Sequence, residues 1–447
     1  MPKQPLPGDR KTDDAGPHHH EVVLLHLPHS LLFLMRNIYH LRCGSHNPNP
    51  SGNGVPMIAI DEFLFPRRLV AAPGAASRLG RLMLGDQVPL GAVMVIADSI
   101  VHELGLDRGL VTDLEDNGYQ PLVFAEITGE PDDLVLKRAV AAARSAGAVA
   151  FIGIGGGSAL DVAKLVAHAV GGDVEPDELR GPVAPIADFP FLALVPTTVG
   201  TGAEATRVAM FAVGGAKRAV LSPQFVPAVA VLDADLVAGL PAPVVAATAL
   251  DALSHALESA MSTTSNDLTW QFSVQAARTV LDRLPPALAG DAEARGDLLY
   301  ASFLAGVALN AGVVLGHSMS YVLAARHGLA HGVGCSLALP YCLAYNQTMD
   351  APRAARLAAE VLQDEASGLL DLATRVARLS ADAGLPTDLL GFGSGTEEPA
   401  QLAARVVSDY PRPTNPVPLE TGRLTTLITH LRSGDLAGAW TAMGATP

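Results

Sequence analysis

The sequence predicts an α/β domain with a largely parallel sheet, followed by an all-α domain. Short β-branched segments alternate with helical segments as far as about residue 237. From residue 238 onwards, alanine and leucine recur at helical spacing, and no convincing strand follows. The chain has 447 residues, 49% hydrophobic and 17% charged, a globular composition with room for large cores.

The α/β pattern begins at Met57, and we assign residues 57–237 to this domain. Strands are expected at residues 91–98, 121–127, 148–157, 191–198 and 229–235, with a helix at 134–147. Residues 238–447 form the expected all-helical domain, because segments such as 243–261 carry apolar residues at helical spacing.

Residues 1–56 differ from the rest and are rich in Pro, His, Gly and Asn. We expect a disordered extension, or a start of translation at Met57. A metal-binding tail around the histidine run 18–20 is the alternative. The apolar stretch 22–35 is interrupted by Pro28 and is too short to span a bilayer, so we expect no membrane association.

A glycine turn follows the expected strand at 148–157. Gly155, Gly156 and Gly157 let the backbone approach a ligand closely, and Ser158 can cap the helix that follows. Free N–H groups at the start of a helix suit a pyrophosphate. Glycine turns are also common as purely structural features, but the order of strand, glycines and helix favours a Rossmann-like, dinucleotide-binding domain.

Two further features could contact a dinucleotide. Asp98 ends the first expected strand of this set, where a carboxylate can bind an adenosine ribose and repel a 2′-phosphate, or can be an ordinary strand-end residue. The loop after the strand at 191–198 carries hydroxyls that could hold nicotinamide and phosphate. These are the hydroxyls of Thr197, Thr198, Thr201 and Thr206.

One carboxylate and three imidazoles are candidates for a metal site. Asp251 and His255 are four residues apart, so they share one face of a helix. His317 lies in an apolar run, 308–325, that we expect to be one buried helix, and His331 opens a second such run. Together they suit a catalytic Zn²⁺ or Fe²⁺ with an open position, although each histidine alone could be an ordinary core or surface residue.

Several segments carry a family resemblance in the same order along the chain. They are GIGGGSALDVAK (153–164), PTTVGTGAEAT (196–206), DALSHALE (251–258), GHSMSY (316–321) and AHGVGCSLALP (330–340). The chain resembles the iron-containing (group III) alcohol dehydrogenase family from about residue 57 to about residue 420. The interval from His317 to His331 is 331 − 317 = 14 residues, as in the family's last two ligands.

The resemblance implies roles for individual residues. It implies that Asp251, His255, His317 and His331 bind the metal, with Fe²⁺ expected and Zn²⁺ as the alternative. It also implies that Asp98 selects NAD(H) over NADP(H). The threonine loop and Lys217 would contact the dinucleotide. Where many members carry Asn-Pro before the glycine strand, this chain has Glu130-Pro131.

The implied reaction is the metal-dependent, NAD(H)-linked interconversion of an aldehyde and an alcohol. Where many members have a second histidine four residues after the third ligand, this chain has Tyr321. A phenol, with a pKa of about 10, is a poor base but could donate a proton to an alkoxide, which favours aldehyde reduction. Alternatively, Tyr321 only shapes the pocket.

Residues 317–341 resemble the branch that contains phosphonoacetaldehyde reductases, so we expect a short aldehyde that carries an anionic group. Arg207 and Arg326 are the candidate cations for that group, unless they are ordinary structural or surface arginines. The alternatives within the family are a short-chain alcohol, diol or lactaldehyde dehydrogenase, or a maleylacetate reductase. Those outside it are a dehydroquinate synthase-like cyclase and a non-catalytic scaffold.

Charge and cysteine content restrict partners and location. The net charge is −15 with no basic run, which argues against a nucleic-acid partner. Three cysteines are too few for a disulfide framework and fit a reducing cytoplasm. Cys335, beside His331, is a soft ligand or, more simply, an inert buried thiol. The family resemblance implies a homodimer.

Overall fold

Six parallel strands organise the first half of the chain. The computed structural model describes residues 63–213, 216–392 and 399–444, so the expected extension at 1–56 lies outside the described residues. The strand order is β1-β9-β6-β4-β2-β3, and every pair is parallel. The strands are β1 (Arg68–Ala71), β2 (Ala92–Asp98), β3 (Gln120–Ile127), β4 (Ala150–Gly155), β6 (Phe191–Pro196) and β9 (Val229–Leu232).

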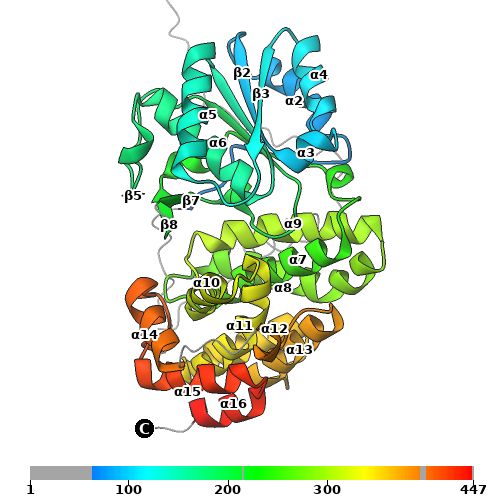
Figure 1. Ribbon diagram of the computed structural model, residues 1–447. Helices are drawn as coiled ribbons and strands as arrows, with labels where there is room; N and C mark the ends of the chain where they lie inside the picture. The colour runs from blue at the N-terminus through cyan, green and yellow to red at the C-terminus, as the bar shows by residue number, and fades with distance from the viewer. Residues whose placement is uncertain (1–62, 214–215, 393–398, 445–447) are drawn as a thin grey trace, which may run out of the picture.

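Helices cover both faces of this sheet, which is why its strands are apolar on both sides. On β2, Met94 and Ile96 pack in the cluster formed with α5 (Asp133–Ala146) and α6 (Gly157–Gly171). The alternating residues Val93 and Val95 pack in the cluster with α2 (Leu79–Gly85) and α4 (Arg108–Asp116). The short α3 (Ser99–Glu103) follows β2 directly (Figure 1).

The strand order places a ligand crevice at one point of the sheet. From β2 the chain goes to β3 on one side and then returns to β4 on the other. In such sheets, ligands bind at the carboxyl ends of the strands where the order reverses. Asp98 ends β2, and Gly155 ends β4. The fold therefore brings the acidic strand end and the glycine turn to the same crevice.

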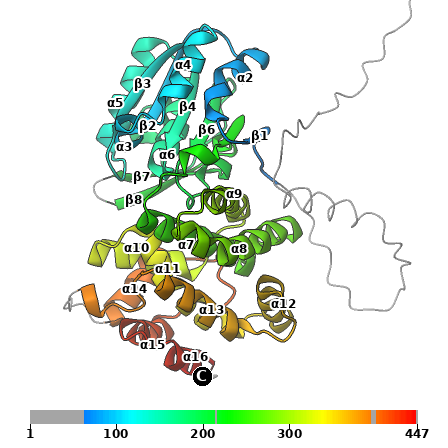
Figure 2. The same cartoon turned by 90° about the vertical axis from the view of Figure 1, so that its right-hand side faces the viewer.

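The expected strands and the helix at 134–147 are confirmed, with small shifts at their ends. Strand β1, which has only four residues, was not expected from the sequence. A small second sheet was not expected either, and it consists of β5 (Gly181–Pro182), β7 (Val208–Val213) and β8 (Ala216–Leu221). Strands β7 and β8 form an antiparallel hairpin. In both views this hairpin lies at the side of the sheet domain nearest the helices (Figures 1 and 2).

Long helices make up the second half of the described chain. They are α7 (Ala242–Met261), α8 (Asp267–Leu288), α9 (Ala292–Leu309), α10 (Leu315–His327), α11 (His331–Tyr345), α12 (Ala351–Leu362), α13 (Leu369–Asp382), α14 (Pro399–Asp409), α15 (Thr421–Arg432) and α16 (Leu436–Gly444). No strand occurs between Pro241 and Gly444 in the described residues, as expected. None of the described helices is long and apolar enough to cross a bilayer. The domain division expected between residues 237 and 238 falls between β9 and α7 and stays a prediction.

Helix α7 lies in the part of the helical half nearest the sheet domain (Figure 2). Every residue from Ala249 to Met261 is buried, and small side chains let α8, α9 and α11 pack closely against it. Polar side chains on such a helix have no access to bulk water. The polar side chains of Asp251, His255 and Glu258 on α7 therefore need partners inside the protein.

The expectation of a single helix over residues 308–325 is wrong. Helix α9 ends at Leu309, and α10 begins at Leu315. Gly312, with φ of 83°, makes the left-handed turn between them. Asn310 and Gly312 are turn residues, but the apolar residues around them obscured that signal. Because the chain breaks here, His317 lies in the first turn of a new helix.

Candidate active site

Three imidazoles converge on one carboxylate oxygen between the two halves of the molecule. Asp251 and His255 lie one turn apart on α7, as their spacing predicts, while His317 comes from α10 and His331 from α11. The distances to Asp251 Oδ1 are 3.6 Å from His331 Nε2, 3.8 Å from His317 Nε2 and 3.9 Å from His255 Nε2. All four residues selected from the sequence therefore meet at one point.

The donor set fits a divalent cation. Asp251 Oδ1 is buried and has no hydrogen-bond partner among the described residues. A buried carboxylate oxygen without a partner is costly, and a cation in contact with it removes that cost. Burial lowers the pKa of His331 to about 3, and it also lowers the pKa of His255. Their Nε2 atoms are therefore available as neutral ligands.

Each imidazole is oriented by a partner on its other nitrogen. His317 Nδ1 lies 2.7 Å from Glu258 Oε1, and His255 Nδ1 lies 3.2 Å from the carbonyl oxygen of Gly200. His331 Nδ1 lies 3.3 Å from the hydroxyl of Ser320. An acceptor at Nδ1 fixes the tautomer that leaves Nε2 free to bind a metal.

Glu258 is a site residue that sequence reasoning missed. It is fully buried on α7, and its Oε2 accepts hydrogen bonds from the backbone N–H groups of Val314 (2.9 Å) and His317 (3.2 Å). One carboxylate therefore caps the start of α10 and orients its histidine. The signal was present, because Glu258 lies seven residues after Asp251 and thus on the same face of α7.

The crevice at the end of β2 and β4 is built mainly from backbone. Asp98 Oδ2 accepts a hydrogen bond of 2.6 Å from the N–H of Gly156. Gly155 has φ of 151°, and a Cβ there would lie 2.3 Å from Asp98 Oδ2. Burial raises the pKa of Asp98 to about 6, against the opposing effect of the Gly156 hydrogen bond. A side chain at position 155 would thus displace Asp98, the residue expected to bind the ribose.

The expectation that Ser158 caps the helix is wrong. Helix α6 begins at Gly157, with Gly156 in an extended conformation at its N-cap and no side-chain capping bond. Ser158 is therefore already inside the first turn. Among the described residues, no side-chain cap binds the N–H groups of Gly157 and Ser158, so these groups can donate hydrogen bonds to an anion.

The threonine loop connects the two halves of the site. A Cβ at Gly157 would lie 2.9 Å from Thr201, and Gly156 lies against Thr198. Thr198 and Thr201 are half-buried, whereas Thr197 and Thr206 are buried. The Thr206 hydroxyl lies 3.1 Å from Lys164 Nζ, behind the loop. The same loop supplies the Gly200 carbonyl that orients His255.

Tyr321 lies beside the histidines with two cations over its ring. Its ring centroid is 5.3 Å from that of His331 and 6.2 Å from that of His317. Lys217 Nζ and the Arg412 guanidinium each lie 5.8 Å from the Tyr321 centroid. Burial raises the pKa of Tyr321, so the phenol keeps its proton and can donate it.

The two arginines selected from the sequence as candidate cations are carried by different elements. Arg207 is half-buried just before β7, and Arg326 is exposed in the last turn of α10. Arg412, beside Tyr321, was missed. It follows α14 in a proline-rich segment, 412 − 331 = 81 residues after His331, so no spacing connected it to the site.

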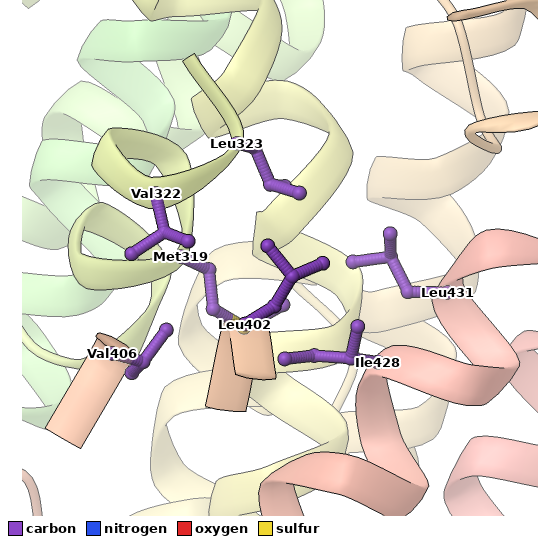
Figure 3. Close-up of a pocket in the computed structure, with 7 residues that line it drawn as sticks. All are labelled: Met319, Val322, Leu323, Leu402, Val406, Ile428 and Leu431. Atoms are coloured by element: carbon purple, nitrogen blue, oxygen red, sulfur yellow. The ribbon is translucent and has the colours of Figure 1, made fainter. Parts of the chain in front are cut away.

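An apolar pocket lies between α10, α14 and α15 (Figure 3). Its lining residues are Met319, Val322, Leu323, Leu402, Val406, Ile428 and Leu431. None of these side chains can ionise, and none is a nitrogen or oxygen ligand. The pocket is therefore part of the core packing and not a candidate catalytic site.

Comparison with known proteins places this geometry in a family. The family model for iron-containing alcohol dehydrogenase matches residues 66–234, and the model for the C-terminal part of the Fe-containing alcohol dehydrogenase family matches residues 245–431. The long-chain-alcohol dehydrogenase 1 of Geobacillus thermodenitrificans is 33% identical over 73% of this chain and 86% of its own length. This chain belongs to the iron-containing alcohol dehydrogenase family.

Members of the iron-containing alcohol dehydrogenase family differ in substrate. The NAD-dependent methanol dehydrogenase of Bacillus methanolicus is 29% identical over 80% of this chain and 96% of its own length. The crystal structure of sulfoacetaldehyde reductase from Bifidobacterium kashiwanohense in complex with NAD⁺ superposes with a TM-score of 0.76 at 25% identity, covering 83% of this chain and 98% of that chain. The family-level activity is NAD-linked interconversion of alcohols and aldehydes.

Proposed function

We propose that this protein is a metal-dependent, NADH-linked reductase of a short aldehyde that carries an anionic group, such as phosphonoacetaldehyde. The observation that carries this proposal is the pair of cations, Lys217 and Arg412, beside the Tyr321 phenol. A neutral alcohol or diol has no group that needs such a pair. The sulfoacetaldehyde reductase with the same fold supports an anionic substrate, because a sulfonate and a phosphonate both suit a guanidinium.

Arg412 is the better of the two cations for this task. Lys217 Nζ already lies 2.8 Å from Glu130 Oε2, which offsets much of its charge. Arg412 Nε is buried and has no hydrogen-bond partner among the described residues. A buried donor without a partner is costly, so an anionic substrate oxygen that accepts its hydrogen bond would gain that energy. We assign Arg412 to the anion, in place of Arg207 and Arg326.

Asp251, His255, His317 and His331 would hold the metal, with Fe²⁺ expected and Zn²⁺ as the alternative. The bound cation would polarise the carbonyl oxygen, and the nicotinamide would supply the hydride. Glu258 keeps the His317 ring in place through its 2.7 Å contact. Tyr321, held between the cations and His331, donates the proton to the developing alkoxide.

The dinucleotide would lie in the crevice of the sheet. The first turn of α6 would bind its pyrophosphate, and Gly155, Gly156, Gly157, Ser158, Thr197, Thr198 and Thr201 would line it. Asp98 would accept a hydrogen bond from the adenosine ribose and repel a 2′-phosphate, so we propose NADH over NADPH. Thr206 supports the loop through Lys164. A homodimer and a cytoplasmic location stay predictions.

The test is NADH oxidation by the Fe²⁺-loaded protein against matched aldehydes, with a chelated sample as control. The panel holds phosphonoacetaldehyde, sulfoacetaldehyde, lactaldehyde and propionaldehyde. We expect the highest kcat/KM on an anionic member and no turnover after chelation. Turnover on neutral aldehydes alone would support the alternative of a short-chain alcohol dehydrogenase and would contradict the proposal of an anionic substrate. An absence of NADH oxidation with any of them would favour the cyclase or scaffold alternative.

Variants at Arg412 sharpen this test. Arg412→Ala should lower kcat/KM for the anionic aldehydes by about 10–100-fold more than for the neutral ones, as expected for a charged hydrogen bond. Arg412→Lys should recover part of this loss. Arg423→Ala is the matched control, because Arg423 also lies over a tyrosine ring, that of Tyr345, and also has a buried Nε without a partner among the described residues. Equal losses on both substrate classes would contradict the assignment.

A further inference from the structure

The structure assigns Cys335 as an additional ligand of the metal at this centre, a role that shifts the metal preference from Fe²⁺ towards Zn²⁺. This inference rests on the proposed metal centre and adds a residue that lies outside the four-ligand set. It depends on the position of the Cys335 thiol relative to the donor atoms, on its burial and on its chemistry.

The Cys335 sulfur lies among the donor atoms themselves. Cys335 is four residues after His331 on α11, so the two side chains share one face of the helix. Its Sγ is 3.7 Å from His331 Nε2 and 3.9 Å from His317 Nε2. Asp251, His317, His331 and Cys335 each offer one donor atom, and these atoms all lie within 4.8 Å of one another.

Two observations distinguish this thiol from an ordinary core cysteine. Cys335 is 1% exposed, yet its sulfur lies within reach of imidazole nitrogens and a carboxylate oxygen. Asp251 Oδ1, in the same group, is buried and has no hydrogen-bond partner among the described residues. A cation that satisfies this oxygen would therefore lie within reach of the sulfur as well.

Cys342 shows what a buried thiol outside the centre looks like. It is on the same helix, seven residues later, and is fully buried. Its sulfur accepts a hydrogen bond of 3.6 Å from Asn346 Nδ2, and it takes no part in the donor group. The two cysteines share a helix and a degree of burial, so Cys342 is a close control for any effect of removing a thiol.

The chemistry of sulfur gives the consequence. Cys335 would hold the cation through its thiolate sulfur, with the thiol proton released to solvent. A thiolate is a soft ligand that binds Zn²⁺ well, whereas carboxylate and imidazole donors alone also suit Fe²⁺. The thiolate would also add a second negative charge among the donor atoms, beside that of Asp251. The wild-type protein should therefore prefer Zn²⁺ more strongly than a variant without the thiol.

Cobalt substitution tests this ligand directly. The metal-free full-length protein is titrated with Co²⁺, and absorption is followed in the near ultraviolet, where thiolate-to-cobalt charge transfer appears. We expect this band in the wild type and in Cys342→Ser and its loss in Cys335→Ser, while Co²⁺ still binds. A second variant, Cys335→Ala, guards against coordination by the serine oxygen, and circular dichroism of each variant checks that it folds.

Metal competition provides the second measurement. After equilibration with equal Zn²⁺ and Fe²⁺ under anaerobic conditions, the Zn²⁺ to Fe²⁺ ratio should fall by at least about tenfold in Cys335→Ser relative to Cys342→Ser. A wild-type Co²⁺ complex without the charge-transfer band, or a band that persists in Cys335→Ala, would overturn the assignment and leave the metal centre intact. Failure of the wild type to bind Co²⁺ at all would overturn the metal centre and this inference together.

Discussion

The two halves of the site are built by different means. In the sheet domain, the crevice consists of backbone groups at the ends of β2 and β4, and Asp98 is held by the N–H of Gly156. In the helical domain, side chains from three helices meet at the Asp251 carboxylate, and each imidazole has a partner on its other nitrogen. The geometry of the cofactor crevice therefore depends on the absence of side chains at its glycines, whereas the geometry of the metal site depends on the identity of its side chains.

This difference predicts how each half responds to substitution. An isosteric change that alters one donor atom should damage the metal half, because the remaining atoms cannot replace a lost ligand. The cofactor half should tolerate changes of side-chain chemistry at most positions. It should fail only where a new Cβ has no space or where the Asp98 charge is lost.

The largest effect is expected for Asp251→Asn. The amide keeps the size of the side chain but removes the negative charge on which all three imidazoles converge. Turnover should fall by at least about 10³-fold, because the metal supplies the charge stabilisation of the transition state. Metal content and kcat are measured on the same sample. A variant that keeps one metal ion per chain and full turnover would show that the imidazoles do not need this carboxylate.

The next effect is expected for Glu258→Gln, which leaves the four proposed ligands in place. Loss of the charged acceptor at His317 Nδ1 should weaken metal affinity by about 10–100-fold. Equilibrium dialysis gives the affinity directly. Excess metal should restore kcat, because Glu258 positions a ligand and does not touch the substrate. A variant with unchanged affinity would indicate that packing alone orients the His317 ring.

Gly155→Ala tests the cofactor half. The new Cβ would lie 2.3 Å from Asp98 Oδ2 and 2.8 Å from Ala159 Cβ, at a φ of 151°. Strain of this kind costs about 1–3 kcal/mol, so KM for NADH should rise by about 10–100-fold. Gly239→Ala, outside this crevice, is the matched control, since a Cβ there would meet no atom within 4 Å. Equal effects at the two positions would contradict the argument from space.

The smallest effect concerns the pH dependence of cofactor binding. Because burial raises the pKa of Asp98 to about 6, the carboxylate is ionised above pH 6 and becomes protonated below it. The ribose needs the ionised form as an acceptor, so KM for NADH should rise as the pH falls below 6, by up to about tenfold per unit. Asp98→Gly should remove this dependence and accept NADPH. An unchanged cofactor preference would refute the role of Asp98.

Side-chain identity and spacing explain how much of the site was predictable. The four metal-binding candidates were found from residue type and the i, i+4 spacing on α7, and the structure brings them together. Most strands of the sheet were found because β-branched residues are concentrated in them. The family resemblance added the order of the motifs, which no single motif supplies.

The rest could not be predicted, for physical reasons. Arg412 reaches Tyr321 only because the chain after α14 folds back onto α10, and nothing local encodes that contact. The start of α6 was misplaced by two residues, from an N-cap at Gly156 to one at Ser158, because glycine, unlike serine, carries no capping side chain to mark an N-cap. The break between α9 and α10 was missed because its turn residues, Asn310 and Gly312, are surrounded by residues as apolar as those of the helices.

The most direct test of the metal centre is a titration of chelated protein with Fe²⁺, with NADH oxidation followed at each addition. The account predicts no oxidation without metal and a linear recovery that saturates at one ion per chain. It also predicts no recovery in Asp251→Asn at any metal concentration. Full NADH oxidation by protein from which the metal has been removed, or recovery by Asp251→Asn equal to that of the wild type, would contradict it.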